Sequence, residues 1–281
     1  MTGLLAPEAS PVRRKARLRN YAMCRPEHFE VTYSINPWMD PHKPTDKALA
    51  LAQWENLRSL YAELGHYVQT IEAAPGLPDM VFAANGALVV DDKVLISRFR
   101  HPERQAEADL WAQWFRDHGY REIVQADFTS EGEGDYVTTG RAVLAGNGFR
   151  SDPRSQAEAE ALFGRPVVSL KLIDPRFYHL DTALAALDDD QIVYYPGAFD
   201  AQSLRVLREL FPDAILADEE DALVFGLNLV SDGYHVILPE PATNLAARLR
   251  DHGFVTYHVD LSELLKAGGS VKCCTLEIRH P

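Results

Sequence analysis

Five polar residues recur at nearly equal intervals within otherwise apolar stretches of the chain. They are Asn85, Glu131, His179, Asn228 and Cys273, with successive gaps of 46, 48, 49 and 45 residues. Buried polar groups need a partner or a function, so this spacing predicts one such residue per structural repeat, gathered around a common axis. A Cys, a His and a carboxylate in one pocket suit nucleophilic catalysis. The thiolate attacks an electrophilic carbon, the imidazole moves protons and the carboxylate orients or neutralises charge.

Each of these residues also has an ordinary structural explanation when it is taken alone. A single Cys in an apolar stretch usually serves packing, and a single buried His usually makes a structural hydrogen bond. The glycine-rich segment 132–134 beside Glu131 is typical of a simple turn. The regular spacing of all five residues favours a shared site over five unrelated ones.

A repeating order of helices and strands predicts how these residues are positioned. Five amphipathic stretches are expected as helices, at 45–65, 103–118, 154–164, 199–211 and 241–252. Each precedes a short β-rich run, at 66–71, 122–126, 167–173, 214–217 and 255–259. Two apolar runs around a polar turn follow, with turns at Asp91-Asp92, Thr139-Gly140, Asp188-Asp189-Asp190 and Asp232-Gly233.

The fifth repeat is cut off at 273–278 by the end of the sequence, and the extended run 29–35 is expected to complete it. The chain therefore predicts five units averaging about 47 residues in a closed ring with a central channel. We expect one α/β propeller domain over 21–281, preceded by a loose basic tail over 1–20.

The composition limits the class of protein. With 281 residues and 46% hydrophobic residues, the chain can bury a large core, which excludes a disordered protein. The formal charge of −13 argues against nucleic acid or an anionic membrane as the main partner. Three cysteines without a CxxC pair predict neither a disulfide framework nor a cysteine-based zinc site. Without an apolar run of 18 residues or a signal sequence, a cytoplasmic protein is expected.

Short motifs in one consistent order over about 23–278 resemble the guanidine-modifying enzyme superfamily. They are Cys24-Arg25-Pro26, Ile35-Asn36-Pro37-Trp38-Met39, Pro78-Asp79-Met80-Val81-Phe82, Glu131-Gly132-Glu133-Gly134-Asp135, Gly146-Asn147-Gly148-Phe149-Arg150, His179-Leu180-Asp181-Thr182 and Gly268-Gly269 ahead of Cys273. The superfamily includes arginine deiminases, dimethylarginine dimethylaminohydrolases, amidinotransferases and arginine dihydrolases. The resemblance implies the five-bladed α/β propeller called the pentein fold.

The resemblance also implies roles for individual residues, without a metal or organic cofactor. Cys273 is similar to the nucleophile that attacks the guanidinium carbon, and His179 to the general acid and base. Glu131 and Asp181 resemble carboxylates that clamp the guanidinium nitrogens, with Asp181 expected on the same strand face as His179.

Two arginines resemble residues that hold the substrate carboxylate, while the second of the adjacent cysteines does not resemble a catalytic residue. The arginines are Arg150 and Arg104, although Arg104 fits a solvated residue at a helix start equally well. Cys274 is expected to serve packing, because relatives usually carry an apolar residue there.

Asn85 departs from most of the superfamily, which carries Asp at this position. An amide can donate a hydrogen bond to a carbonyl oxygen, and arginine dihydrolases are similar to this chain both there and around Asn36. Asp181 disfavours dimethylarginine, because methylation removes the N–H donors that the carboxylate needs. The hypothesis is therefore a hydrolase that converts free arginine to ornithine, ammonia and carbon dioxide.

Several alternatives stay open at this point. A dimethylarginine dimethylaminohydrolase or an arginine deiminase would yield citrulline, and an amidinotransferase would pass the amidino group to an amine. A ligand-binding relative without catalysis is also open, although retention of Cys273, His179 and Glu131 together argues against it. The expected partner is a small-molecule substrate, and a homo-oligomer is left open.

Overall fold

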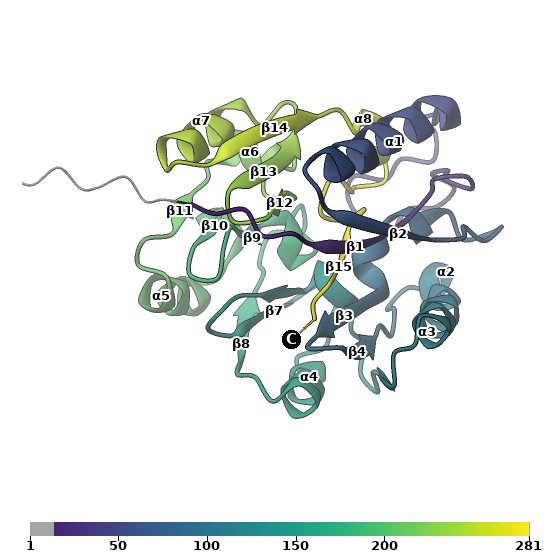
Figure 1. Ribbon diagram of the computed structural model, residues 1–281, viewed down its shortest axis with the longest axis horizontal. Helices are drawn as coiled ribbons and strands as arrows, with labels where there is room; N and C mark the ends of the chain where they lie inside the picture. The colour runs from purple at the N-terminus through teal and green to yellow at the C-terminus, as the bar shows by residue number, and fades with distance from the viewer. Residues whose placement is uncertain (1–13, 281) are drawn as a thin grey trace, which may run out of the picture.

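The structure, a computed structural model, describes residues 14–280 and contains five three-stranded sheets arranged around a centre (Figure 1). The sheets have the orders β15-β1-β2, β3-β4-β5, β6-β7-β8, β9-β10-β11 and β12-β13-β14. The strands are β1 (Asn20–Cys24), β2 (Tyr67–Ile71), β3 (Ala87–Val90), β4 (Lys93–Ile96), β5 (Glu122–Gln125), β6 (Tyr136–Thr138), β7 (Val143–Asn147), β8 (Val167–Lys171), β9 (Leu184–Ala186), β10 (Ile192–Tyr194), β11 (Ile215–Leu216), β12 (Val230–Ser231), β13 (His235–Pro239), β14 (Val255–Val259) and β15 (Leu276–Ile278).

Every sheet has the same internal pattern, in which the middle strand pairs antiparallel with the first strand and parallel with the third. A parallel pair needs a crossover connection, and a helix supplies it in each sheet. These helices are α1 (Lys47–Glu63), α3 (Glu107–Asp117), α4 (Ser155–Phe163), α5 (Ala201–Leu210) and α7 (Thr243–Asp251). They lie on the outside of the ring (Figure 1). The predicted helices and third strands are thus confirmed, with ends shifted by a few residues.

Short helices lie in the connections between and within these repeats. Three are α-helical, namely α2 (Pro102–Gln105), α6 (Glu219–Leu223) and α8 (Ser262–Leu265). Five are 3₁₀ turns, namely η1 (Pro78–Val81), η2 (Ala83–Gly86), η3 (Gly132–Gly134), η4 (Leu180–Thr182) and η5 (Pro196–Ala198). Among residues 14–280, no helix is long and apolar enough to cross a bilayer.

The predicted polar turn between β3 and β4 explains why these strands form a hairpin. Val90 pairs with Lys93, so only Asp91 and Asp92 connect the strands. Both residues have positive φ, 52° and 62°. A two-residue hairpin turn of this type needs positive φ at both positions, which Asp tolerates better than most residues.

The closure of the ring differs from the prediction. β15 pairs antiparallel with β1, through Asn20↔Ile278 and Ala22↔Leu276, and the run 29–35 forms no strand. Phe29 and Val31 are nevertheless buried in the same apolar cluster as Met23. Apolar side chains in this run therefore reflect burial and not strand pairing, a distinction that a short apolar run does not make.

The predicted boundary of the basic tail also needs correction. Arg14 donates from Nη1 to Asp188 at 2.9 Å and from Nε to the carbonyl of His252 at 2.7 Å, and its guanidinium lies 3.4 Å from the ring centroid of Phe254. Residues 14–20 thus lie against the ring, because their cations pair with acidic residues of its surface. Residues 1–13 of the predicted tail lie outside the described part of the chain.

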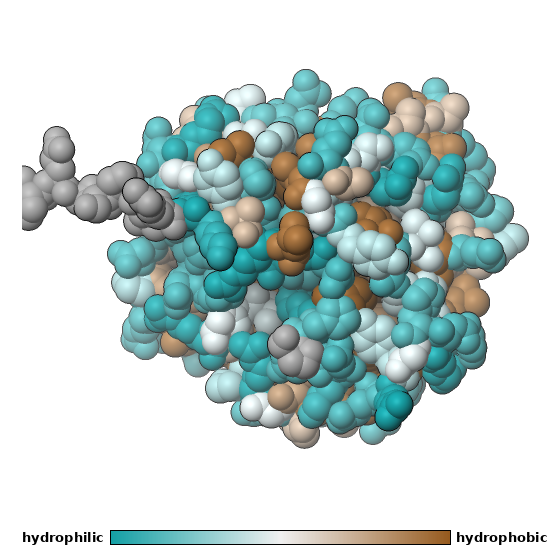
Figure 2. Space-filling view, viewed as in Figure 1, coloured by the Kyte–Doolittle hydropathy of each residue, from teal (hydrophilic) through white to brown (hydrophobic). Residues whose placement is uncertain are grey.

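The surface seen in Figure 2 is largely hydrophilic, and its hydrophobic residues gather in small groups. This agrees with an acidic chain in which Asp and Glu number 41. The apolar residues instead form five clusters of buried side chains, which pack between the sheets and their covering helices.

Candidate active site

The five regularly spaced polar residues occupy equivalent places in the five repeats. Each lies in a turn just ahead of the first strand of its sheet: Asn85 before β3, Glu131 before β6, His179 before β9, Asn228 before β12 and Cys273 before β15. These first strands contact one another, β15 with β3, β6 with β9 and β9 with β12, so they surround the centre of the ring. All five side chains are buried, with at most 2% of their surface exposed.

Cys273 contacts a carboxylate and an amide. Its sulfur lies 3.4 Å from Asp181 Oδ2 and 3.1 Å from Asn228 Nδ2, and its backbone N–H donates to Asn228 Oδ1 at 3.0 Å. The sequence suggested that Cys273 and Cys274 lie in a strand. They lie instead in a turn over 271–274, because β15 starts only at Leu276. Cys274 is fully buried and makes no side-chain hydrogen bond within the described residues.

Asp181 reaches Cys273 from a 3₁₀ turn, whereas the sequence predicted that it shares a strand face with His179. It lies in η4 and not on the strand that follows His179. The 3₁₀ turn, and not strand alternation, therefore brings both side chains toward the centre. Burial raises the pKa of Asp181 to about 6.

Glu131 is held by a cation and by the imidazole. Its Oε2 accepts from Arg150 Nη1 and lies 2.7 Å from His179 Nε2, while its Oε1 accepts from the backbone N–H of Arg100 at 3.0 Å. Burial opposes ionisation of Glu131, but Arg150 and His179 more than offset it, so the pKa of this carboxyl lies well below its usual range. Both oxygens thus have partners within the protein, and Oε2 lies where it orients His179, while clamping of a guanidinium by Glu131 stays a prediction.

Arg150 and Arg104 also make contacts within the protein, and their role in holding the substrate carboxylate stays a prediction. Arg150 donates from Nη2 to the carbonyl of Ile35 at 2.9 Å in addition to its ion pair with Glu131. Arg104 donates from Nη1 to Asn85 Oδ1 at 2.7 Å and binds Glu107 in a bidentate ion pair with both distances 2.8 Å. Arg104 is 3% exposed, so the alternative of a solvated helix-start residue is wrong.

The pairing with Arg104 fixes the orientation of the Asn85 amide. Arg104 can only donate, so Oδ1 of Asn85 faces it and Nδ2 points away. Nδ2 lies 3.4 Å from the carbonyl oxygen of Glu131, a weak contact at most. Asn85 therefore presents an N–H donor on the side away from Arg104.

Asn36 lies in a segment that contacts the beginning of the loop between α8 and β15. Its Nδ2 donates to the carbonyl of Ala267 at 3.0 Å, and Trp38 Nε1 donates to the carbonyl of Arg176 at 2.9 Å. Tyr178 binds the carbonyl of Gly268 at 2.5 Å in the same region. Asn36 is thus next to the loop that leads to Cys273, and within residues 14–280 its side chain makes no hydrogen bond to the five central side chains.

Two buried polar atoms at this centre have no hydrogen-bond partner among the described residues. They are His179 Nδ1 and Asp181 Oδ1. Unpaired buried polar atoms are costly, and in native sites they commonly await a ligand or water. An N–H or O–H donor would pair with Asp181 Oδ1, and a group that donates or accepts a hydrogen bond would pair with His179 Nδ1.

The surroundings of Cys273 disfavour its thiolate. Burial, followed by the nearby carboxylate of Asp181, raises the pKa of Cys273 well above its ordinary value. A bound cation between the thiol and Asp181 would reverse this effect, because it favours both ionised forms.

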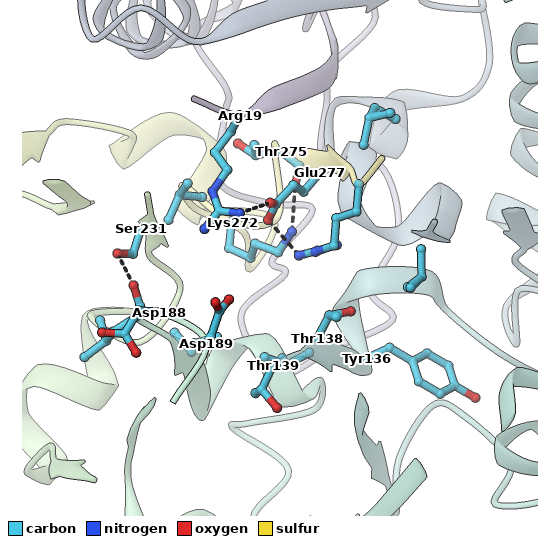
Figure 3. A pocket seen from close by; sticks show the side chains of 18 of the residues that line it. Arg19, Tyr136, Thr138, Thr139, Asp188, Asp189, Ser231, Lys272, Thr275 and Glu277 are labelled. Carbon is cyan, nitrogen blue, oxygen red and sulfur yellow. Dashed lines mark hydrogen bonds and ion pairs between the residues drawn. The ribbon is translucent and has the colours of Figure 1, made fainter. Parts of the chain in front are cut away.

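A cavity of about 470 Å³ lies close to these residues, and Figure 3 shows part of its lining. It is lined by residues from the first strands of all five sheets, including Val90, Tyr136, Ala185, Ser231 and Glu277. Asp181 lines it too, whereas Cys273 and His179 do not. Asp181 thus lies between the cavity and the thiol.

Sequence reasoning missed some of these contacts. The spacing identified Asn228, but it gave no role to this residue, and nothing in the sequence marked Glu107 as the partner of Arg104. Within residues 14–280, no three His, Cys, Asp or Glu side chains are arranged to hold a metal ion. The absence of a metal or cofactor stays a prediction.

Comparison with known proteins adds independent evidence. The model of the family "N,N dimethylarginine dimethylhydrolase, eukaryotic" matches residues 25–280. The chain is 55% identical to the N(G),N(G)-dimethylarginine dimethylaminohydrolase of Mycobacterium tuberculosis, over 97% of this chain and 89% of that protein. It is 40% identical to the bifunctional arginine dihydrolase/ornithine cyclodeaminase ArgZ of Synechocystis sp., over 92% of this chain but only 37% of that longer protein.

Solved structures support the same fold. The substrate-bound N-terminal domain of ArgZ, an arginine dihydrolase from the ornithine-ammonia cycle in cyanobacteria, matches with a TM-score of 0.90 at 38% identity. The match covers 94% of this chain and 99% of that domain. A dimethylarginine dimethylaminohydrolase adduct shares the fold with a TM-score of 0.77 at 20% identity. The predicted five-bladed pentein fold is therefore confirmed.

Proposed function

The chain belongs to the dimethylarginine dimethylaminohydrolase family and is a hydrolase of guanidino C–N bonds, and from this premise we propose that its substrate is free L-arginine and its final product ornithine. Arginine and one water give citrulline and ammonia. Citrulline and a second water then give ornithine, ammonia and carbon dioxide. Both hydrolyses use the same thiol, which forms a covalent adduct with the carbon that loses ammonia. The adduct of the second hydrolysis is a thiocarbamate, and water converts it to a carbamate that breaks down to ornithine and carbon dioxide.

The contacts of Cys273 support its role as nucleophile. A guanidinium bound by Asp181 would supply N–H donors to the unpartnered Oδ1 and would lie beside the sulfur. Its positive charge favours the thiolate, which attacks the guanidinium carbon. His179, oriented by Glu131, then protonates the departing ammonia and takes a proton from the water that cleaves the thioether.

The observation that carries the second hydrolysis is the orientation of Asn85. Its N–H donor points away from Arg104, whereas an Asp there would present an acceptor. A ureido group has a carbonyl oxygen in place of one guanidinium nitrogen, and a donor stabilises it. Asn85 thus suits a site that must accept both arginine and citrulline.

Dimethylarginine is the second candidate substrate, because the 55% identical relative is named for it. Against it stands Asp181, whose unpartnered Oδ1 needs an N–H donor that a dimethylated nitrogen lacks. The two candidates differ in their products, since dimethylarginine yields dimethylamine and citrulline.

The test is product analysis of the purified protein with arginine, citrulline and dimethylarginine in parallel. We expect arginine to yield ornithine and two equivalents of ammonia, and citrulline to be consumed. Dimethylamine released faster than ammonia would establish the second candidate instead. An additional incubation of arginine with glycine or lysine tests for an amidinotransferase, which would form a new guanidino compound.

A further inference from the structure

Asn228 makes more contacts with Cys273 than any catalytic candidate does, although the proposed chemistry gives it no task. Its Oδ1 accepts from the backbone N–H of Cys273 at 3.0 Å, and its Nδ2 lies 3.1 Å from the sulfur. Nδ2 also donates to the carbonyl oxygen of Asp181 at 3.2 Å. The side chain is fully buried.

The neighbours of Asn228 leave only one orientation for its amide. The backbone N–H of Cys273 can only donate, so it must face Oδ1, and the carbonyl of Asp181 can only accept, so it must face Nδ2. Nδ2 carries two hydrogens. One binds the Asp181 carbonyl and the other is directed at the sulfur of Cys273.

We propose that Asn228 is the positioning residue for the nucleophile, fixing the Cys273 sulfur from one side and stabilising its thiolate through the N–H of Nδ2. This inference rests on the proposed role of Cys273. An N–H donor stabilises a thiolate more than a thiol, because the hydrogen bond is then charge-assisted. The amide thus acts against Asp181, whose negative charge opposes ionisation of the sulfur.

The titratable groups around the sulfur come from η4 with the residues just before it, and from the turn that carries Cys273. Asp181 approaches from η4, with His179 ahead of it, and Tyr178 is close enough for its pKa to respond to Cys273. Cys274 is the neighbour within the same turn. None of these groups is an uncharged amide fixed by two backbone contacts. Asn228 is such a group, because the backbone N–H of Cys273 and the carbonyl of Asp181 hold its two ends.

A purely structural role for Asn228 must be separated from this one. Its backbone carbonyl accepts from Lys272 N at 3.2 Å, so the residue also supports the turn that carries Cys273. Thr275 supports the same turn without touching the sulfur, because its hydroxyl donates to the carbonyl of Val271 at 2.8 Å. Thr275→Val is therefore the matched control for Asn228→Ala.

The experiment measures alkylation of Cys273 by iodoacetamide against pH in the full chain, with tandem mass spectrometry separating Cys273 from Cys274. We expect Asn228→Ala to raise the pH midpoint of Cys273 alkylation by about one unit. At a fixed pH below the midpoint, this corresponds to about tenfold less thiolate. The value of kcat should fall by a similar factor with little change in KM. Asn228→Asp, which turns an acceptor toward the sulfur, should shift the midpoint further.

Thr275→Val should leave the midpoint unchanged even if it lowers thermal stability. An unchanged midpoint in both Asn228 variants would overturn the proposal and leave Asn228 as a structural residue. Cys273→Ser is measured in parallel, because turnover by that variant would overturn the nucleophile itself. An inactive Cys273→Ser with an unchanged midpoint in Asn228→Ala would overturn only the role of Asn228.

Discussion

At the scale of single residues, two adjacent cysteines have different surroundings. Cys273 contacts Asp181 and Asn228, whereas Cys274 lies buried among apolar side chains. We expect Cys273→Ser to abolish turnover, because a Ser hydroxyl is far less nucleophilic than a thiolate, and to leave substrate binding largely intact. Cys274→Ser should reduce activity much less. Steady-state kinetics and arginine binding by calorimetry measure both effects, and the reverse order of losses would contradict the assignment.

The raised pKa of Asp181 predicts how activity depends on pH. Burial raises this pKa to about 6, so the carboxylate is protonated at lower pH and binds guanidinium poorly. We expect kcat/KM, which reports the free enzyme, to fall about tenfold per unit below pH ~6. Asp181→Asn should lower kcat/KM by roughly 10- to 150-fold at neutral pH and should remove this acidic limb. If kcat/KM of Asp181→Asn still decreased below the same pH, the decrease would be due to another titratable group.

Asn85 decides, under the proposed function, whether citrulline is an intermediate or an end product. In Asn85→Asp, one oxygen pairs with Arg104 and the other replaces an N–H donor by an acceptor. This acceptor opposes the ureido carbonyl at a cost on the order of 1–3 kcal/mol, or 5- to 150-fold. The variant should therefore accumulate citrulline where the parent forms ornithine.

A time course of both products checks this expectation. Asn85→Ala is the control, because it removes the donor without adding an acceptor and should slow the second hydrolysis less. Equal loss of both hydrolyses in Asn85→Asp would show that Asn85 does not distinguish them.

At the scale of elements, Gly134 in η3 leaves room for the side chains of Asn85 and His179 to pack against the turn. A Cβ on Gly134 would lie 2.3 Å from Asn85 Nδ2 and 3.1 Å from His179 Nδ1. We expect Gly134→Ala to lower kcat/KM by about 100-fold, because displacements near 1 Å at a catalytic centre have effects of that size. Gly164→Ala is a suitable control, since its left-handed backbone gives a cost in stability while its Cβ meets open space. Similar kinetics in the two variants would contradict the steric argument.

The elements also show where the sequence was informative. The five helices and third strands follow from amphipathic periodicity and short β-rich runs, which are local signals. The 3₁₀ turns that hold Asn85 and Asp181 have no such signal, because their conformation depends on contacts such as Arg104 with Asn85 and Leu180 N–H with Asp135. The candidate residues could therefore be identified from spacing and resemblance, while their mutual contacts could not.

At the scale of the whole molecule, the repeat predicted five units in a ring, but the partner of the last strand was wrong. β1 and 29–35 are both short apolar stretches that precede the first helix, and only long-range pairing distinguishes them. The contacts of Glu131 with His179 and of Cys273 with Asp181 and Asn228 were unpredictable for the same reason, since they join different repeats. Sequence periodicity thus gives the architecture, and contacts between repeats give the chemistry.

One such contact between repeats links the chain's C-terminal segment to η3. Glu133 is fully buried and binds Lys272 Nζ at 2.5 Å, the guanidinium of Arg279 and the backbone N–H of Glu277. Burial opposes ionisation of Glu133, but Arg279 and Lys272 more than offset it and lower its pKa. Its contribution to folding stability is therefore complete above the unfolded pKa near 4.5 and is lost as the pH falls below it.

Glu133→Gln should consequently destabilise the whole ring. It leaves two cations facing a neutral amide, and breaking a buried ion pair from one side costs about 3–5 kcal/mol. We expect the lower end, about 3 kcal/mol, because Arg279 keeps its ion pair with Glu277. Urea denaturation at pH 7 measures this loss, and the difference from the parent should shrink as the pH is lowered toward 4.

Glu122→Gln is the control. It removes an exposed ion pair with Lys93 and should cost less than about 1 kcal/mol. Equal losses in the two variants would mean that the buried network does not hold the C-terminal segment in the ring.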